Sequence, residues 1–259
     1  MIIRPARPGG CALEGTSVSL PLVSIVVPSK NQGRFIDDML DSILFGTDVP
    51  LEVLIIDGGS TDDTAARVAL RHDIRLQFIP HLDAHPGPLS AIGYGISRAT
   101  GQWIGIQTTS DGYAPGALSW FASYTHANPS LAWVAGGTKE WLPRTCSLTP
   151  DDAIAFDLGM ITGTWMDRHI AQTVGVDPRW WLCHLPFSLH VVLEALKQGR
   201  SCQTVSRVLC FYRSHEANSF KRDKVETHRQ TFEARKELAS RYSTLLTSRQ
   251  QEWLHSPVF

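Results

Sequence analysis

Apolar residues of the chain fall into short β-branched runs separated by stretches with helical spacing. Val23–Val27 and Leu51–Ile56 are apolar runs of strand length, and residues 34–45 between them place their apolar side chains on one broad helical face. Strand, loop, helix and strand within about forty residues is the length of one βαβ unit. The pattern therefore predicts two parallel strands joined by a helix at the start of the chain.

The same alternation continues toward the C-terminus. Residues 138–165 show no period, whereas residues 223–253 are charged with helical spacing. Strands that alternate with helices are typical of an α/β fold with a mainly parallel sheet flanked by helices. Further strands are predicted at residues 74–79, 103–107, 131–136 and 205–212, and further helices after Ser60 and at residues 89–98, 115–127 and 186–197.

Polar loops follow both strands of the predicted βαβ unit. Pro28 is expected to end the first strand because it has no N–H for the next ladder position, and Asn31 is expected to cap the following helix. At the second strand end, Asp57 is placed to accept hydrogen bonds from a base or a ribose, and Gly58 lets a ligand approach the backbone. Both loops lie at the carboxyl edge of a parallel sheet, where ligands bind.

For each of these residues alone, ordinary turn and cap chemistry is an equally good explanation. Residues 60–63, Ser-Thr-Asp-Asp, have the pattern of a capping box that opens the next helix. The two loops together favour a nucleotide site. The chain has no G-x-G-x-x-G after a strand and no G-K-[ST], so neither a dinucleotide fingerprint nor a P-loop is present.

Composition narrows the class of protein. The 259 residues include 43% hydrophobic and 19% charged residues, which are values of a globular chain. The net charge of −1 gives no electrostatic case for nucleic acid. Five cysteines without a C-x-x-C favour a reducing compartment. No stretch approaches the roughly 18 apolar residues of a membrane span, so we expect a cytoplasmic protein, with a peripheral position at the inner face of the membrane as the alternative.

Three segments are expected along the chain. Residues 1–21 are rich in Pro and Gly and predict a flexible leader. Residues 22–222 carry the alternating strands and helices of one domain. Residues 223–259 predict a C-terminal helical extension packed on that domain, and this helix is also the candidate contact for a homo-oligomer.

Four stretches together resemble a known family. VSIVVPSKNQGRFI and LEVLIIDGGSTDDT are similar to the opening of the large inverting, nucleotide-sugar-dependent glycosyltransferase family of the family 2 type. ATGQWIGIQTTSDGYAPGAL and FYRSHEANSFK continue the resemblance over roughly residues 22–225. It implies a GT-A (Rossmann-like) fold with a mixed sheet. It also implies transfer of a sugar from a nucleoside-diphosphate sugar to a glycan, lipid-linked or small-molecule acceptor, in polysaccharide or glycoconjugate synthesis.

The resemblance also implies which residues bind the donor and a metal ion. Relatives hold a divalent cation, Mn²⁺ or Mg²⁺, through an Asp after the fourth strand. Here Ser110 occupies that position, so binding of the cation is expected to be weak or absent. Asp111 and His215 are the candidate metal ligands. For Asp111 the structural alternative is a helix cap, and for His215 a solvated loop. The donor site is expected to contain Pro28, Ser29, Asn31, Asp57, Gly58, Ser90, Thr109, Ser110, Asp111 and Arg213.

The general base is altered as well. Relatives carry an acidic pair at the start of a helix, where this chain has Phe-Ser-Leu-His at residues 187–190. Ser188 stands in the place of the base, and His190 or His184 can supply an imidazole that titrates near neutrality. The alternative is that these histidines are structural.

The resemblance also implies an Asp at the position of Ser90, so serine replaces an acid at Ser90, Ser110 and Ser188. Two functions follow, a glycosyltransferase of the hexosyltransferase type, or a catalytically impaired pseudoenzyme or regulatory subunit that binds nucleotide sugars. A nucleotidyltransferase is less favoured, since the Gly-rich basic triphosphate loop of that class is absent near the first strand.

Overall fold

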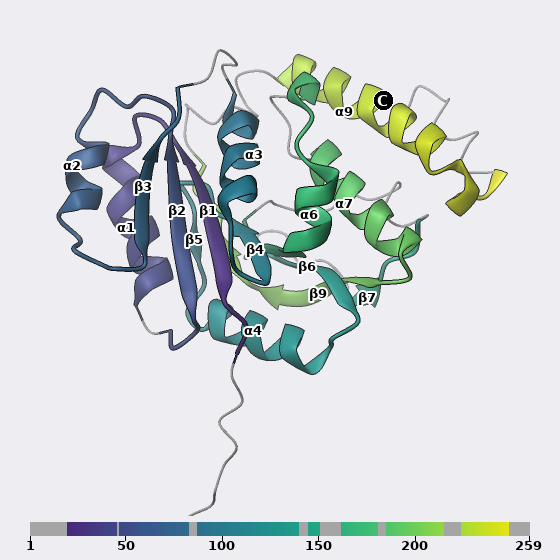
Figure 1. Cartoon of the computed structure of the whole chain (residues 1–259), viewed down its shortest axis with the longest axis horizontal. Coiled ribbons are helices and arrows are strands. Elements are labelled where there is room, and N and C mark those ends of the chain that lie inside the picture. The colour runs from purple at the N-terminus through teal and green to yellow at the C-terminus, as the bar shows by residue number, and fades with distance from the viewer. Residues whose placement is uncertain are drawn as a thin grey trace, which may run out of the picture.

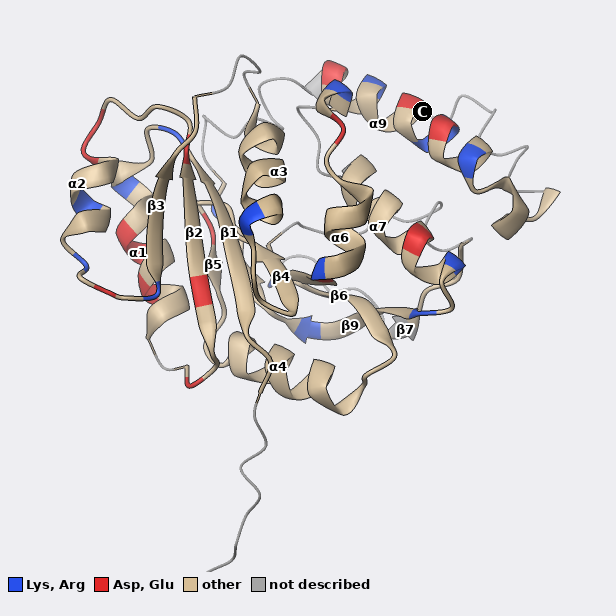
Figure 2. Ribbon diagram, in the orientation of Figure 1, with Lys and Arg blue, Asp and Glu red and all other residues tan. Residues whose placement is uncertain are grey.

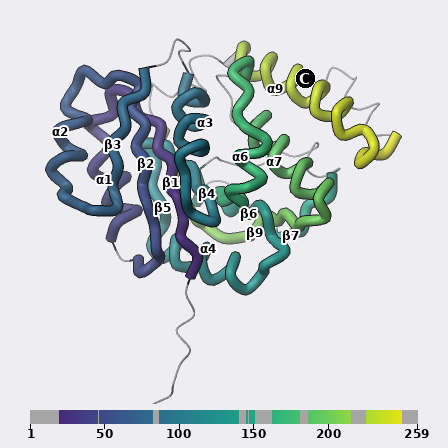
Figure 3. The backbone as a smooth tube through the Cα atoms, viewed as in Figure 1, coloured from purple at the N-terminus to yellow at the C-terminus, as the bar shows by residue number. Residues whose placement is uncertain are grey.

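The computed structural model of the chain is an α/β structure built around one large sheet (Figure 1). The described part of the chain comprises residues 20–45, 47–82, 87–139, 145–150, 162–180, 185–214 and 224–248. The predicted leader falls almost entirely outside these residues. Figure 3 shows the N-terminal half of the chain, purple to blue, and the C-terminal half, green to yellow, on opposite sides of the sheet's centre.

The strands of the described residues form a sheet in the order β3-β2-β1-β4-β8-β6-β9-β7. Neighbours from β3 to β4 are parallel, and β8 runs antiparallel to both β4 and β6. The predicted mixed, mainly parallel sheet is confirmed. Its strands are β1 (Val23–Ser29), β2 (Leu51–Asp57), β3 (Leu76–Pro80), β4 (Trp103–Ile106), β6 (Leu131–Gly137), β7 (Cys146–Ser147), β8 (Thr164–Asp167) and β9 (Ser201–Val208). A separate antiparallel pair joins β5 (Gly112–Tyr113) to β10 (Cys210–Phe211).

Helices cover both faces of this sheet, with one buried apolar cluster on each side. Side chains of α1 and α4 belong to one cluster, and those of α3, α6, α7 and α9 to the other. The helices are α1 (Gly33–Leu44), α2 (Thr64–Ala69), α3 (Pro88–Arg98), α4 (Ala117–Ala127), α6 (Arg168–Val174), α7 (Leu185–Lys197) and α9 (Lys224–Arg241), with the short 3₁₀ turns η1 (Pro178–Trp180) and η2 (Ser243–Leu245).

Pro28 does not end β1, contrary to the prediction. It is paired in register with Ile56, and Ser29 is paired with Asp57. Successive residues of a strand bond to opposite neighbours: the Val26 carbonyl accepts from Gln107 on the β4 side, and the Ser29 carbonyl accepts from Gly58 on the β2 side. Pro28 therefore faces β4, which has already ended at Ile106. Its missing N–H costs no ladder bond there.

The stretch predicted to be irregular, residues 138–165, contains strand β7 and overlaps the start of strand β8. Trp165 and Met166 are fully buried, and β8 pairs with β4 and β6. Four residues are too few to show a period, and the pairing depends on distant segments of the chain. The predicted strand 205–212 was also wrong in its limits, since β9 begins at Ser201 and β10 is separate.

Helix α9 packs against α7 and η1. The Tyr242 hydroxyl, just after the helix, donates to the Glu194 carboxylate of α7 at 2.7 Å, and Arg179 of η1 forms an ion pair with Glu237 at 2.8 Å. Figure 2 shows charges of both signs along α9. An oligomer contact through this helix stays a prediction. Among the described residues, no helix combines the length and apolar character needed to cross a membrane.

Candidate functional site

The loops after β1 and β2 are joined by hydrogen bonds in both directions. Asn31 N–H donates to the Ser60 hydroxyl at 2.8 Å, and Thr61 N–H donates to the Asn31 side-chain oxygen at 2.7 Å. Gly33 N–H, in the first turn of α1, donates to the Asp62 carboxylate at 2.9 Å. Each loop therefore satisfies backbone donors of the other, and the two form one unit at the carboxyl edge of the sheet.

Asn31 is consequently not the cap of α1. The residue preceding the helix is Gln32, which makes no side-chain cap bond, and Asn31 takes a left-handed backbone conformation with φ of 54°. Asn tolerates this conformation because its short polar side chain bonds locally. The capping box predicted at residues 60–63 is also absent, since Asp63 precedes α2 without a side-chain cap bond. The N–H groups at the start of α1 are satisfied by Asp62 and Thr64 instead.

Asp57 organises the turn at the end of β2. One carboxylate oxygen accepts from the amides of Gly59 and Ser60 at 3.1 and 2.9 Å, and the other accepts from the Ser60 hydroxyl at 2.5 Å. The side chain is only 5% exposed. Because a carboxylate has about four lone-pair sites, capacity remains for one more donor. Asp57 can therefore hold the turn and still bind a ligand N–H or O–H.

Two buried oxygens at neighbouring strand ends lack a hydrogen-bond partner among the described residues. They are the Ser29 hydroxyl at the end of β1 and the side-chain carbonyl of Gln107 directly after β4. Buried polar atoms are almost always paired, with protein, water or ligand. Ser29 was predicted from the sequence as a donor-site residue, whereas Gln107 was not. Its signal was a polar residue directly after a fully apolar strand.

Ser90 lies in the first turn of α3 and contacts His81, the residue directly after β3. The Ser90 hydroxyl is 3.1 Å from the ring atom Nε2 of His81. The backbone N–H of His81 donates to the backbone carbonyl of Asp57 at 2.8 Å. The His81 ring stacks on Tyr94 of α3, with centroids 4.3 Å apart. Ser90 is thereby connected to the same strand ends as Asp57.

Asp111, in the loop after β4, is held by donors from three segments. The Thr108 hydroxyl donates to Oδ2 at 2.5 Å, and the Thr162 hydroxyl donates to the same oxygen at 3.3 Å. The Arg213 N–H donates to Oδ1 at 3.0 Å, and the Ser110 hydroxyl at 3.4 Å. Burial raises the pKa of Asp111, although these hydrogen bonds oppose the effect. Thr109, in the same loop, is 6% exposed.

Arg213 joins this loop to the start of α1. Its guanidinium forms an ion pair with Asp38 at 2.8 Å and lies over the Phe35 ring, 5.0 Å from the centroid. The side chain is 43% exposed, so the charge is accessible to an anion. Arg213 therefore brings a positive charge beside the loop that follows β1.

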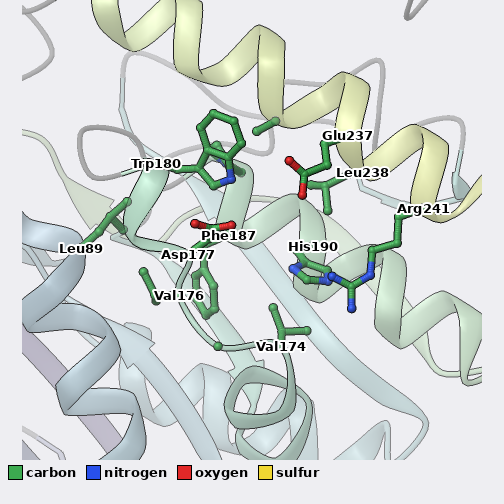
Figure 4. A pocket seen from close by; sticks show the side chains of 13 residues that line it. Leu89, Val174, Val176, Asp177, Trp180, Phe187, His190, Glu237, Leu238 and Arg241 are labelled. Carbon is green, nitrogen blue, oxygen red and sulfur yellow. The ribbon is translucent and has the colours of Figure 1, made fainter.

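His190 lies elsewhere, in a pocket of about 260 Å³ between α6, η1, α7 and α9 (Figure 4). Its ring meets Tyr242 edge-on at 5.7 Å. The pocket lining includes Trp180, Phe187 and Arg241 but no residue of the loops after β1, β2 and β4. Burial lowers the pKa of His190 to about 4, and the charge of Arg241 adds to this shift.

Ser188 is buried in the first turns of α7, with 3% exposure. The structure thus separates His190 from the cluster formed by Asn31, Asp57, Asp111 and Arg213. The other two histidine candidates, His184 and His215, lie outside the described residues, so the structure assigns no position to either side chain.

The described residues do not fit the divalent cation implied by the resemblance. Ser110 offers a neutral hydroxyl, and the oxygens of Asp111 are already occupied by protein donors. Hard cations prefer ionised oxygen ligands. Within the described stretches, no group of three or more His, Cys, Asp or Glu residues is placed to hold a metal ion.

Comparison with known families decides the class of this domain. Residues 24–141 match the family described as Glycosyl transferase family 2. This segment, a little under half of the chain, is similar to glycosyltransferase family 2. The match contains β1, β2, β4 and the loops built around Asn31, Asp57 and Asp111.

Two relatives of the matched segment have names that refer to biosynthesis. A "PGL/p-HBAD biosynthesis glycosyltransferase" of Mycobacterium bovis is 32% identical over 88 residues, which are 34% of each chain. "Succinoglycan biosynthesis protein ExoO" of Rhizobium meliloti is 35% identical over 99 residues, 38% of this chain and 28% of that protein. The similarity thus spans about a third or less of these relatives.

Solved structures share the fold. TarS 1-349 of S. aureus, in complex with UDP-GlcNAc, has a TM-score of 0.66 at 14% identity and covers 82% of this chain and 66% of its own. The mannosyltransferase PcManGT of Pyrobaculum calidifontis, in complex with GDP-Man and Mn²⁺, has a TM-score of 0.65 at 20% identity, with coverage of 83% and 64%. The predicted GT-A fold is therefore confirmed.

The environment of His190 generates a pH-dependent prediction. Its pKa is about 4 in the folded protein and about 6.5 when unfolded, so between these values the unfolded chain binds more protons. His190 therefore makes its full contribution to the free energy of unfolding above pH 6.5, and this contribution is lost as pH falls toward 4. In thermal unfolding, a His190→Gln variant should lose less Tm than the wild type between pH 6.5 and pH 4.

The exposed His126 provides the control, because His126→Gln should follow the wild-type curve. If His190→Gln and wild type lose the same Tm over this range, His190 is not held neutral by its pocket.

Proposed function

We propose that the protein transfers a sugar from a nucleoside-diphosphate sugar to an acceptor hydroxyl with inversion, in polysaccharide or glycoconjugate synthesis. The observation that carries the proposal is the joined pair of loops after β1 and β2, with Asp57 at their centre, within the family 2 segment. The names of the relatives and the donors in TarS and PcManGT support the same class of substrate.

The chain's own residues suggest how the donor is bound. The remaining acceptor site of Asp57 suits an N–H of the base or a ribose hydroxyl. The backbone at Gly58 is not crowded, since an added Cβ would meet the Lys30 side chain and the Ser29 carbonyl oxygen only at 3.6 Å. The orphan oxygens of Ser29 and Gln107 can pair with ligand groups or with water. Arg213 supplies the positive charge for the diphosphate.

The transfer step needs an acceptor hydroxyl that attacks the anomeric carbon from the face opposite the leaving diphosphate. A positioned base typically contributes about 10²–10⁴-fold to such a step. Residues 181–190 contain no Asp or Glu, and His190 faces α9. This observation favours the second candidate function, a protein that binds nucleotide sugars without efficient transfer.

Asp57→Asn tests the donor site while keeping its turn. The amide oxygen can still accept from Gly59 and Ser60, and the amide nitrogen can donate to the Ser60 hydroxyl, but the charge and an acceptor are lost. Affinity for UDP or GDP in calorimetry should fall by at least about tenfold, since hydrogen bonds to charged groups contribute about 1.5–3 kcal/mol.

Asp48→Asn is the matched control, because Asp48 is exposed and precedes β2 at the opposite edge of the sheet. If the Asp57→Asn variant binds UDP or GDP with the affinity of the wild type and has an unchanged Tm, the donor site lies elsewhere.

Ser188→Asp distinguishes the two candidate functions. A carboxylate at this position restores the type of base that relatives carry, so release of nucleoside diphosphate from UDP-glucose or GDP-mannose should rise by about 10²-fold or more. Ser188→Asn, which has the same size without the charge, should give no increase.

For the proposed enzyme, the wild type should show release above the uncatalysed rate. If neither wild type nor Ser188→Asp releases nucleoside diphosphate while both still bind it, the binding function replaces the transferase.

A further inference from the structure

The carboxylate of Asp111 connects three segments that are far apart in the sequence. Its partners are Thr108 and Ser110 in its own loop, Thr162 in the turn before β8, and the backbone of Arg213 after β10. The side chain is 6% exposed. Asp111, next to the position of the usual metal ligand, thus forms a buried junction between these three segments.

This carboxylate has little capacity left for a cation. A carboxylate offers about four lone-pair sites, and four protein donors point at its two oxygens. Three of these bonds lie within 3.3 Å and the Ser110 bond is longer, at 3.4 Å. A cation at Asp111 would have to displace hydroxyl or amide donors in a buried place, where each unpaired donor costs stability.

The bond to Arg213 extends a β ladder. Cys210 pairs with Tyr113 and Phe211 with Gly112 in the antiparallel ribbon of β5 and β10. The next bond along the ribbon is formed by the Asp111 side chain, which accepts the Arg213 N–H. Asp111 therefore fixes the main chain of Arg213 in register with the loop after β4.

The side chain of Arg213 continues from this anchor to α1, where it contacts Asp38 and the Phe35 ring. Its position beside the loop after β1 thus depends on the backbone that Asp111 holds. A guanidinium is permanently charged and suits phosphate oxygens in two-pronged hydrogen bonds.

We propose that Asp111 is a positioning residue and not a cation ligand: it anchors the end of β10 and thereby holds Arg213, whose guanidinium provides the positive charge at the donor diphosphate. The role of Arg213 rests on the proposed function. The role of Asp111 as a junction does not depend on it.

Thermal unfolding with and without MnCl₂ tests the junction. Asp111→Asn removes the charge and one acceptor oxygen that these four donors share, so their hydrogen bonds weaken and Tm should fall by about 4 °C or more in metal-free buffer. Any shift in Tm caused by Mn²⁺ should be the same in wild type and variant. Asp48→Asn, which removes an exposed carboxylate, should leave Tm unchanged.

A metal ligand would behave in the opposite way. An Asp111→Asn protein that keeps or gains Tm without metal overturns the proposal, and so does loss of an Mn²⁺-dependent stabilisation that the wild type shows. Should Asp111→Asn fail to fold, Thr162→Val decides the matter. Loss of one donor to Asp111 should lower the metal-free Tm, and an unchanged Tm would contradict the junction.

A double-mutant cycle tests whether Asp111 acts through Arg213. Affinities for UDP and GDP are measured by calorimetry in metal-free buffer for wild type, Asp111→Asn, Arg213→Ala and the double variant. Each single variant should weaken binding by about tenfold or more. The double variant should bind no more weakly than Arg213→Ala, because both changes remove the same contact.

If the loss of affinity in the double variant equals the product of the two single losses, Asp111 acts independently of Arg213. This result would overturn the positioning role. If the wild type binds neither UDP nor GDP, the proposed function and the role of Arg213 fail together. The metal-free Tm and the Mn²⁺ comparison then still decide whether Asp111 is a junction or a ligand.

Discussion

The reciprocal hydrogen bonds between the loops after β1 and β2 are the constraint on which the candidate site depends. The backbone N–H groups of Asn31 and Gly33 donate to side chains of the loop after β2, and the Thr61 N–H donates to the Asn31 side chain. The parallel register that pairs Ser29 with Asp57 brings these loops together. The resulting unit is rigid enough to present Asp57 in one orientation, because this carboxylate is itself fixed by Gly59 and Ser60.

A second junction completes the site from the C-terminal half of the chain. Asp111 binds the backbone of Arg213, and Arg213 reaches back to α1. The loop after β4 is thus tied to the segment that follows β10 and, through the side chain of Arg213, to α1. This arrangement places polar groups and the positive charge of Arg213 along a single edge of the sheet, as the proposed binding of a nucleoside diphosphate requires. It leaves the pocket around His190 as a separate feature on the α9 side of α7.

The extent to which sequence anticipates this structure differs between elements. β1, α1 and β2 were predictable because their apolar runs are long and the loops between them are polar. β8 was not, since its four residues gain their place only by pairing with β4 and β6. The strand end predicted at Pro28 and the helix cap predicted at Asn31 were wrong for a similar reason, because Pro28 faces the end of β4 and Asn31 bonds to the loop after β2. The direction of His190 was not readable from α7, because buried apolar residues precede and follow it in the sequence: Phe187, Leu189, Val191, Val192 and Leu193.

Hydrogen exchange of backbone amides, measured with and without UDP-glucose and GDP-mannose, tests the central claim most directly. A donor bound at the joined loops should slow exchange in residues 29–33, 57–62 and 108–113, and leave the helices around His190 unchanged. Protection confined to α7 and α9, or no protection with either nucleotide sugar, would contradict a donor site at the carboxyl ends of β1, β2 and β4.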